Sequence, residues 1–204
     1  MTVTTYSTIV APVQAELKDK GSRFIAYVYP IHSVAQVKQY VDALREEHHK
    51  ARHWCYAYRL GVDGLQFRAN DDGEPSGSAG RPILGQIDSA GLTDVLVVVV
   101  RYFGGTLLGV PGLIQAYKNS TAEALAIAEI IEKNIEKTVW IRCEYPVLND
   151  AIRIVKQHQG YIVEQDLQLD CKLTVRLPLA SYEACVAAWQ HTRQIEVNLE
   201  EEAF

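Results

Sequence analysis

The chain has 204 residues, with 20 Lys and Arg side chains against 25 Asp and Glu, and its formal net charge is −5 at pH 7. This length is enough for one or two domains with a real hydrophobic core. The negative charge argues against a protein that is basic throughout, as many general nucleic-acid binders are, but leaves room for a local basic patch. The longest apolar run, Val95–Val100, is too short to cross a bilayer, and the N-terminal residues lack a signal-peptide pattern. We therefore expect a cytoplasmic protein that does not associate with membranes.

The first two thirds of the chain alternate between strand and helix patterns. Strands are predicted within 3–17 and at 23–29, 53–60, 65–69 and 94–100, and helices after Ser33 and at 82–90 and 112–133. The run at 94–100 is apolar and mostly β-branched, which is typical of a strand buried on both faces. It leads through a glycine-rich loop into the longest predicted helix.

This loop holds Gly104, Gly105, Gly109 and Gly112 and follows Arg101 and Tyr102. Glycine allows positive φ and close approach of another backbone, and a strand–loop–helix junction presents N–H groups to anions. The Walker-A pattern fails because Val110 and Pro111 replace its Lys and Ser/Thr, and the dinucleotide-binding glycine pattern is absent. The loop therefore predicts either an anion-binding surface or simply a tight connection.

A second polar, glycine-rich loop spans residues 70–82. Its candidate functional residues are Asp71, Asp72, Gly73, Glu74, Ser76 and Gly77. An EF-hand alignment fails, because Arg68 and Ala79 fall on ligand positions. The loop could be solvated, could contact a partner, or could supply general acid/base groups or Mg²⁺ ligands.

Other reactive side chains do not assemble into a complete motif. His53 and Cys55 share one strand face, which permits a thiol nucleophile, but no third orienting group is evident. His48 and His49 lack a third metal ligand nearby. The four cysteines are scattered and are expected to be reduced thiols. No metal site, cofactor or catalytic residue is predicted.

The last third has the order strand 137–145, helix 149–159, strand 161–168, strand 171–178, helix 181–191 and strand 194–199. This order predicts a ferredoxin-like βαββαβ domain. We therefore expect two domains, residues 1–134 and 135–204. The first has 13 cationic and 14 anionic side chains and the second 7 and 11, so the first is the better candidate for binding nucleic acid.

Four motifs appear in a characteristic order at Ser22–Ala26, His53–Arg59, Asp71–Leu84 and Val98–Gly109. Together they resemble the IMPACT/YigZ family, and the resemblance covers about residues 18–130. The trailing domain is similar to the small ferredoxin-like domain of bacterial members. One departure is Pro111, where a small residue is expected before Gly112; it should stiffen the loop.

The resemblance implies an α+β protein with a βα domain like domain IV of elongation factor G, followed by a ferredoxin-like domain like its domain V. It also implies a link to translation. Eukaryotic members carry an additional RWD domain and regulate translation during amino-acid starvation by competing for a ribosome-associated kinase activator.

Two functional hypotheses follow. The first is a non-enzymatic regulator that binds RNA, the ribosome or a translation factor through the glycine loops. Its candidate anion-binding residues are Arg59, Arg81, Arg101, Tyr102, Gly104, Gly105 and Lys118, with Arg68 and Tyr58 as further contributors. The alternative is a hydrolase or phosphate-handling enzyme that uses Asp71, Asp72 and Glu74. We favour binding over catalysis, because none of the catalytic templates is complete. A further possibility is a protein–protein adaptor that acts through the acidic second domain.

Overall fold

The computed structural model describes residues 3–198, and the chain divides into two compact units. The N-terminal unit comprises residues 6–133, and the C-terminal unit comprises residues 134–204 together with 1–5. Each has its own hydrophobic core and is described separately below. The fold is α+β, with antiparallel sheets in both units.

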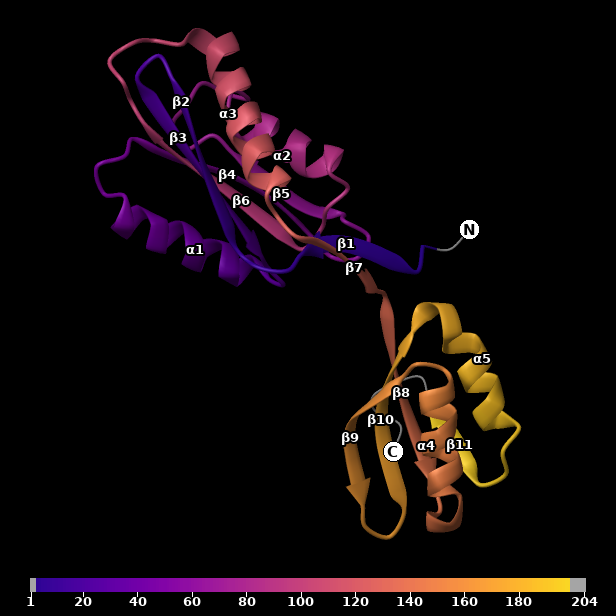
Figure 1. Cartoon of the computed structure of the whole chain (residues 1–204). Coiled ribbons are helices and arrows are strands. Elements are labelled where there is room, and N and C mark those ends of the chain that lie inside the picture. The colour runs from indigo at the N-terminus through magenta and orange to yellow at the C-terminus, as the bar shows by residue number, and fades with distance from the viewer. Residues whose placement is uncertain (1–2, 199–204) are drawn as a thin grey trace. The chain divides into compact units, whose positions relative to one another are not determined.

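The N-terminal unit is built around a five-stranded antiparallel sheet of order β2-β3-β6-β4-β5 (Figure 1). The strands are β2 (Val13–Asp19), β3 (Ser22–Pro30), β4 (His53–Leu60), β5 (Gln66–Asn70) and β6 (Val95–Tyr102). The helices are α1 (Val34–Glu47), α2 (Gly80–Ser89) and α3 (Gly109–Ala126). A separate two-stranded sheet pairs β1 (Thr5–Ile9) with β7 (Ile130–Asn134).

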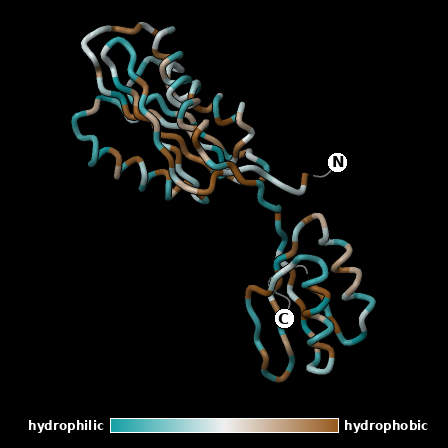
Figure 2. Tube along the Cα trace, viewed as in Figure 1, coloured by the Kyte–Doolittle hydropathy of each residue, from teal (hydrophilic) through white to brown (hydrophobic). Residues whose placement is uncertain are grey.

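Helices cover both faces of the central strand β6, as its continuous apolar sequence predicts. Residues Val95–Val100 are all completely buried. Val97 and Val99 belong to the core beneath α2 and α3, whereas Val98 and Val100 belong to the core beneath α1. Hydrophobic stretches accordingly run through the middle of the unit in Figure 2. This two-sided burial fixes the register of β6 and the place where its last residues emerge.

The C-terminal unit has the predicted ferredoxin-like topology. Its elements are β8 (Glu136–Cys143), the 3₁₀ turn η1 (Tyr145–Val147), α4 (Leu148–Gln157), β9 (Tyr161–Leu167), β10 (Cys171–Pro178), α5 (Leu179–Gln190) and β11 (Ile195–Asn198). The sheet order is β11-β8-β10-β9, with every neighbouring pair antiparallel. Alternate residues of β8 and β10 are buried beneath α4 and α5, so these two central strands carry the core.

The long helix is shorter than its sequence pattern suggests. We expected it to reach residue 133, but α3 ends at Ala126, and Ile130–Asn134 form β7. The β-branched Ile130 and Ile131 favour a strand, and β1 provides its partner. At the other end of the chain, β11 is described only to Asn198, so residue 199 of the predicted final strand lies outside the described part.

Candidate functional site

A buried ion pair lies where β6 ends and the glycine loop begins. The Nη1 of Arg101 donates to Oε1 of Glu74 at 2.6 Å, and both side chains are almost fully buried. The guanidinium also lies over the rings of Phe24, at 5.5 Å, and Phe103, at 5.8 Å. Within residues 3–198, the Nε of Arg101 has no hydrogen-bond partner. Arg101 is thus an internal anchor for the loop rather than an exposed arginine.

Glu74 joins this pair to a buried chain of polar groups. The Oη of Tyr117 donates to Oε1 of Glu74 at 2.8 Å, and Sγ of Cys55 lies 3.3 Å from that Oη. Burial raises the pKa of Tyr117 and that of Cys55 well above their ordinary values. Both groups are therefore neutral at physiological pH, and Cys55 is not a thiolate nucleophile.

His53 lies at the partly open side of this chain. Its Nδ1 is 2.9 Å from the main-chain oxygen of Asp72, which can only accept, so Nδ1 carries the proton. Its Nε2 is 3.9 Å from Oε1 of Glu74. The His53 ring thus stands beside the carboxylate that holds Arg101.

The carboxylate of Asp71 stabilises the start of α2. Its Oδ1 accepts hydrogen bonds from the backbone N–H groups of Ala79 and Gly80, and its Oδ2 accepts one from Gly77. Burial alone would raise the pKa of Asp71, but these three donors, together with Arg81, hold it below the ordinary 3.8. Asp71 therefore caps the N-terminus of α2 from the preceding loop.

Asp72 is engaged in a similar way. Its Oδ2 accepts the backbone N–H of Trp54 at 2.8 Å, and its Oδ1 pairs with Arg45 at 2.7 Å. Its φ of 40° shows the left-handed backbone that this arrangement requires. Gly73 follows with a φ of 86°, and a Cβ there would touch the ring of His53. All three carboxylates of the loop are thus bound to groups of the fold itself.

The polar loop nevertheless leaves part of its length exposed. Ser76 is exposed, and Gly77 has a φ of 76° beside the side chain of Arg81. Arg81 itself is exposed in the first turn of α2. This portion of the loop remains available to a partner.

The glycine loop packs closely against the turn between β2 and β3. A Cβ on Gly104 would lie 1.9 Å from the carbonyl carbon of Gly21, so only glycine fits there. The backbone N–H of Gly104 also donates to Oγ of Ser22 at 3.2 Å. Gly105 follows with a φ of 88° and open space around it. Beyond Gly104, the loop exposes apolar side chains, notably Phe103 and Leu107, of which 47% and 85% is accessible.

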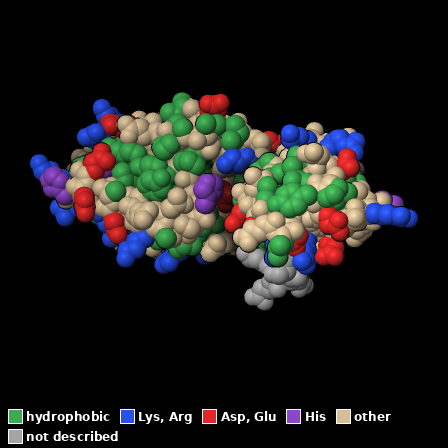
Figure 3. All heavy atoms as spheres, turned by 90° about the horizontal axis from the view of Figure 1, so that it is seen from below, with side chains coloured by type: hydrophobic (Ala, Val, Ile, Leu, Met, Phe, Trp, Pro, Cys, Tyr) green, Lys and Arg blue, Asp and Glu red, His purple; other side chains and the backbone are tan. Residues whose placement is uncertain are grey.

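Two further turns meet the loop at the same end of the sheet. Arg23 lies opposite Tyr102 across β3 and β6, and the backbone N–H of Arg52 donates to the carbonyl of Arg101. We call the surface formed by residues 18–23, 48–53 and 101–112 the glycine-loop end. Its exposed cationic side chains are Lys18, Lys20, Arg23, Lys50 and Arg52. Figure 3 shows Lys and Arg side chains, with some carboxylates, at the left-hand end of this unit.

The charges of the glycine-loop end are only partly compensated. Arg23 and Lys18 pair with Glu16, whereas Lys20, Lys50 and Arg52 form no ion pair within residues 3–198. These three cations are not among the residues predicted from the sequence, because their turns are far apart in the chain. Only the strand pairing that brings the turns together could have identified them.

Tyr102 belongs to this end but is held by neighbours. The Oη of Tyr102 lies 2.9 Å from Nδ1 of His48, and Nε2 of His48 lies 2.7 Å from Oη of Tyr27. The guanidinium of Arg23 lies over the Tyr102 ring. His48, considered above as a metal ligand, therefore links two tyrosines. Within residues 3–198 no group of three or more His, Cys, Asp or Glu side chains is arranged to hold a metal ion.

The remaining predicted cations lie elsewhere. Arg59 is six residues along β4 from His53, toward the opposite end of the sheet, where it pairs with Asp88 and lies over Phe67. Arg68 lines a pocket between α1 and β4–β5 together with Tyr58. Lys118 is exposed on α3. The predicted set is therefore not one site, and of its arginines only Arg101 lies at the glycine-loop end.

Comparisons with known proteins agree with this fold. The model of the Impact N-terminal domain matches residues 20–125. The chain is 38% identical to the IMPACT family member YigZ of Escherichia coli (strain K12) over 83% of this chain and 84% of that protein. An IMPACT family member of Thermus thermophilus is 48% identical over 77% of this chain and 84% of its own length.

A solved crystal structure of a hypothetical protein covers 99% of this chain and 100% of its own, with a TM-score of 0.76 and 33% identity. Among the described residues, no helix has the length and hydropathy needed to span a membrane. The matched domain, which includes both glycine-rich loops and the buried Arg101–Glu74 pair, and the relatives that extend across both units establish that the chain belongs to the IMPACT family.

Proposed function

We propose that this protein is a non-enzymatic, translation-linked regulator that binds RNA, the ribosome or a translation factor through its glycine-loop end. The observation that carries the proposal is the convergence of three turns that are distant in sequence. They gather unpaired cations around an exposed glycine loop whose base is anchored by Arg101 and Glu74. The link to translation rests on membership of the IMPACT family.

The chemistry of this surface suits a polyanion with exposed aromatic rings or bases, such as RNA. Lys20, Lys50 and Arg52 offer charge to phosphates, and the half-exposed ring of Phe103 offers a stacking surface. Close packing of Gly104 on Gly21 holds the loop in place, which reduces the entropy lost on binding. The number of free cations is small, so the affinity should be modest and salt-dependent.

The hydrolase alternative is less well supported by the same geometry. Asp71 caps α2, Asp72 holds Trp54 and Arg45, and Glu74 holds Arg101 and Tyr117. Carboxylates that hold the fold together in this way are less available to a substrate than a general acid or base needs to be. The buried Cys55 thiol offers no substitute.

The test is co-sedimentation of the full chain with ribosomes and with bulk RNA across a salt series of about 50–200 mM. The variant Lys20→Ala/Arg52→Ala removes two exposed cations from the glycine-loop end. The matched control, Lys156→Ala/Arg193→Ala, removes two exposed cations from the C-terminal unit. We expect the first variant to bind more weakly and to lower the salt slope by about 1–2, and the control to match wild type.

Arg101→Ala is a poor first test, because it removes a buried partner of Glu74 and so disturbs the fold as well as the surface. Equal co-sedimentation of the two double variants, or binding that does not change with salt, would contradict the proposal. Hydrolysis of a phosphate ester that is lost in Asp72→Ala would instead favour the enzyme.

A further inference from the structure

Two of the four cysteines face each other across the central strands of the C-terminal unit. Cys143 is the last residue of β8, and Cys171 is the first residue of β10, directly opposite it in the antiparallel register. Both side chains belong to the core beneath α4 and α5, so they lie on the same face of the sheet. Both are free thiols.

This placement meets the main geometric requirement for a disulfide. Directly opposed residues of an antiparallel pair have Cα atoms about 4.5 or 5.5 Å apart, and disulfides form over about 4.4–6.8 Å. The pair is also the last in the β8–β10 ladder, so no further pairing between these two strands lies beyond it. Burial, followed by interaction with the Cys171 thiol, raises the pKa of Cys143 to about 11.

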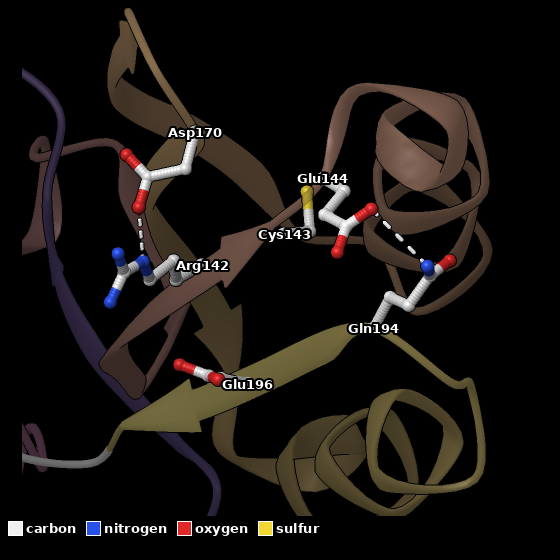
Figure 4. Close-up of a pocket in the computed structure, with 6 residues that line it drawn as sticks. All are labelled: Arg142, Cys143, Glu144, Asp170, Gln194 and Glu196. Atoms are coloured by element: carbon white, nitrogen blue, oxygen red, sulfur yellow. Dashed lines mark hydrogen bonds and ion pairs between the residues drawn. The ribbon is translucent and has the colours of Figure 1, made fainter.

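A pocket at this end of the sheet provides a route to the pair. It has a volume of about 280 Å³ and is lined by six residues, which are Arg142, Cys143, Glu144, Asp170, Gln194 and Glu196 (Figure 4). Arg142 pairs with Asp170, and Gln194 donates to Glu144, as the dashed lines show. One water molecule takes up about 30 Å³ in the liquid, so an oxidant of similar size fits the pocket easily.

We propose that Cys143 and Cys171 are a modification site, a cross-strand thiol pair that a peroxide converts reversibly to a disulfide. The Cys143 thiolate attacks one oxygen of hydrogen peroxide, the O–O bond breaks, and the departing hydroxide takes up a proton to become water. The resulting sulfenic acid is attacked by the sulfur of Cys171, the S–O bond breaks, and the second oxygen leaves as water. Two thiols and one peroxide thus give one disulfide and two waters.

The other two cysteines serve as internal references. Cys185, on α5, is fully buried in the same core, and Cys55 is fully buried in the N-terminal unit beside Tyr117. Neither lies opposite another cysteine in any strand pairing of residues 3–198. The structure therefore predicts one specific cross-link among the possible pairings.

The experiment treats the native full chain with a small excess of hydrogen peroxide, then counts free thiols and analyses a non-reducing digest by mass spectrometry. We expect half of the thiols to be lost, a peptide cross-link between Cys143 and Cys171, and recovery of all thiols with dithiothreitol. The arsenical phenylarsine oxide, which bridges adjacent thiols, should bind the untreated protein at a ratio of one to one.

Variants make the result specific. Cys171→Ala should abolish both the cross-link and arsenical binding and leave a sulfenic acid on Cys143 that dimedone captures. Cys185→Ala, which also changes a buried cysteine of this core, should keep both. Oxidation that instead gives intermolecular dimers, a cross-link to Cys185, or sulfinic acid with both thiols present would overturn the proposal. So would arsenical binding that survives in Cys171→Ala.

Discussion

Nη1 of Arg101 and Oε1 of Glu74 lie 2.6 Å apart, in a position where neither side chain has appreciable contact with solvent. Arg101 stands at the end of β6, and Glu74 stands in the polar loop after β5. The pair therefore ties the two glycine-rich segments together. An ion pair of this kind is costly to break on one side only, because it leaves a buried charge without a partner.

The first prediction concerns this pair. Glu74→Ala should lower the free energy of unfolding by about 3–5 kcal/mol, because Arg101 and Tyr117 both lose their acceptor. The double variant Arg101→Met/Glu74→Leu should lose much less unfolding free energy than the sum of the losses in Arg101→Met and in Glu74→Leu. Urea denaturation measures all of these free energies. A Glu74→Ala protein within about 1 kcal/mol of wild type would show that the pair contributes little.

A second prediction follows from the depressed pKa of Asp71. A carboxyl whose pKa is lower in the folded state contributes stability above its unfolded pKa and loses it as pH falls through the folded value. Asp71→Asn should therefore cost about 1–3 kcal/mol at pH 7, since it removes the charge and one acceptor from the start of α2. The difference from wild type should shrink below the ordinary pKa of 3.8. Thermal unfolding at several pH values checks this, and a difference that stays constant with pH contradicts it.

The close approach of two backbones gives a third prediction. Gly104→Ala should destabilise the protein strongly, because its Cβ would overlap the backbone of Gly21. Gly85→Ala is the matched control, since that glycine is helical with no atom within 4 Å of the added Cβ. The control should gain up to about 1 kcal/mol. If both variants unfold at the same urea concentration, the glycine loop does not pack against the turn.

The fourth prediction separates binding from folding. Leu107 is 85% exposed in the glycine loop, so Leu107→Ser should change the free energy of unfolding by no more than about 0.5 kcal/mol. If this loop enters the interface, co-sedimentation should weaken in the same variant. Leu169, which is fully exposed in the C-terminal unit, offers the control Leu169→Ser. Equal loss of binding in both variants would remove the loop from the proposed surface.

The last prediction concerns the rate at which the thiol pair oxidises. The thiolate reacts with peroxide, and Cys143 has a pKa of about 11, so the rate should rise about tenfold per pH unit between about pH 7 and 9. The charged groups lining the pocket are Arg142, Glu144, Asp170 and Glu196. Arg142 is paired with Asp170. Counting the free thiols in samples quenched at successive times gives the oxidation rate. A rate independent of pH would contradict attack by the Cys143 thiolate.

The sequence was sufficient to predict the elements whose signal is local. The β-branched run of β6, the alternation in β4 and the strand–helix order of the last third all lead to the observed fold. Prediction from the sequence failed where a residue or strand that is distant in the chain determines the local structure. Ile130–Asn134 is a strand because β1 pairs with it, and Arg101 is buried because Glu74, from another loop, reaches it.

The candidate site was predicted less completely than the fold for the same reason. The two glycine-rich loops were found from composition, and the ion pair does join them. Lys20, Lys50 and Arg52 were missed because nothing in their local sequence distinguishes them from ordinary surface charges. Arg59 was expected near the glycine loops, but its strand carries it to the other end of the sheet.

The contact of Gly104 with Gly21 has a consequence for motion. Because the N–H of Gly104 also donates to Ser22, opening of the loop at Gly104 would break its contacts with the β2–β3 turn. The amide hydrogens of the loop and the turn should therefore exchange with solvent as one cooperative unit. A ligand that touches only the glycine loop would slow exchange in the β2–β3 turn as well, so protection of the turn would report that the loop is occupied.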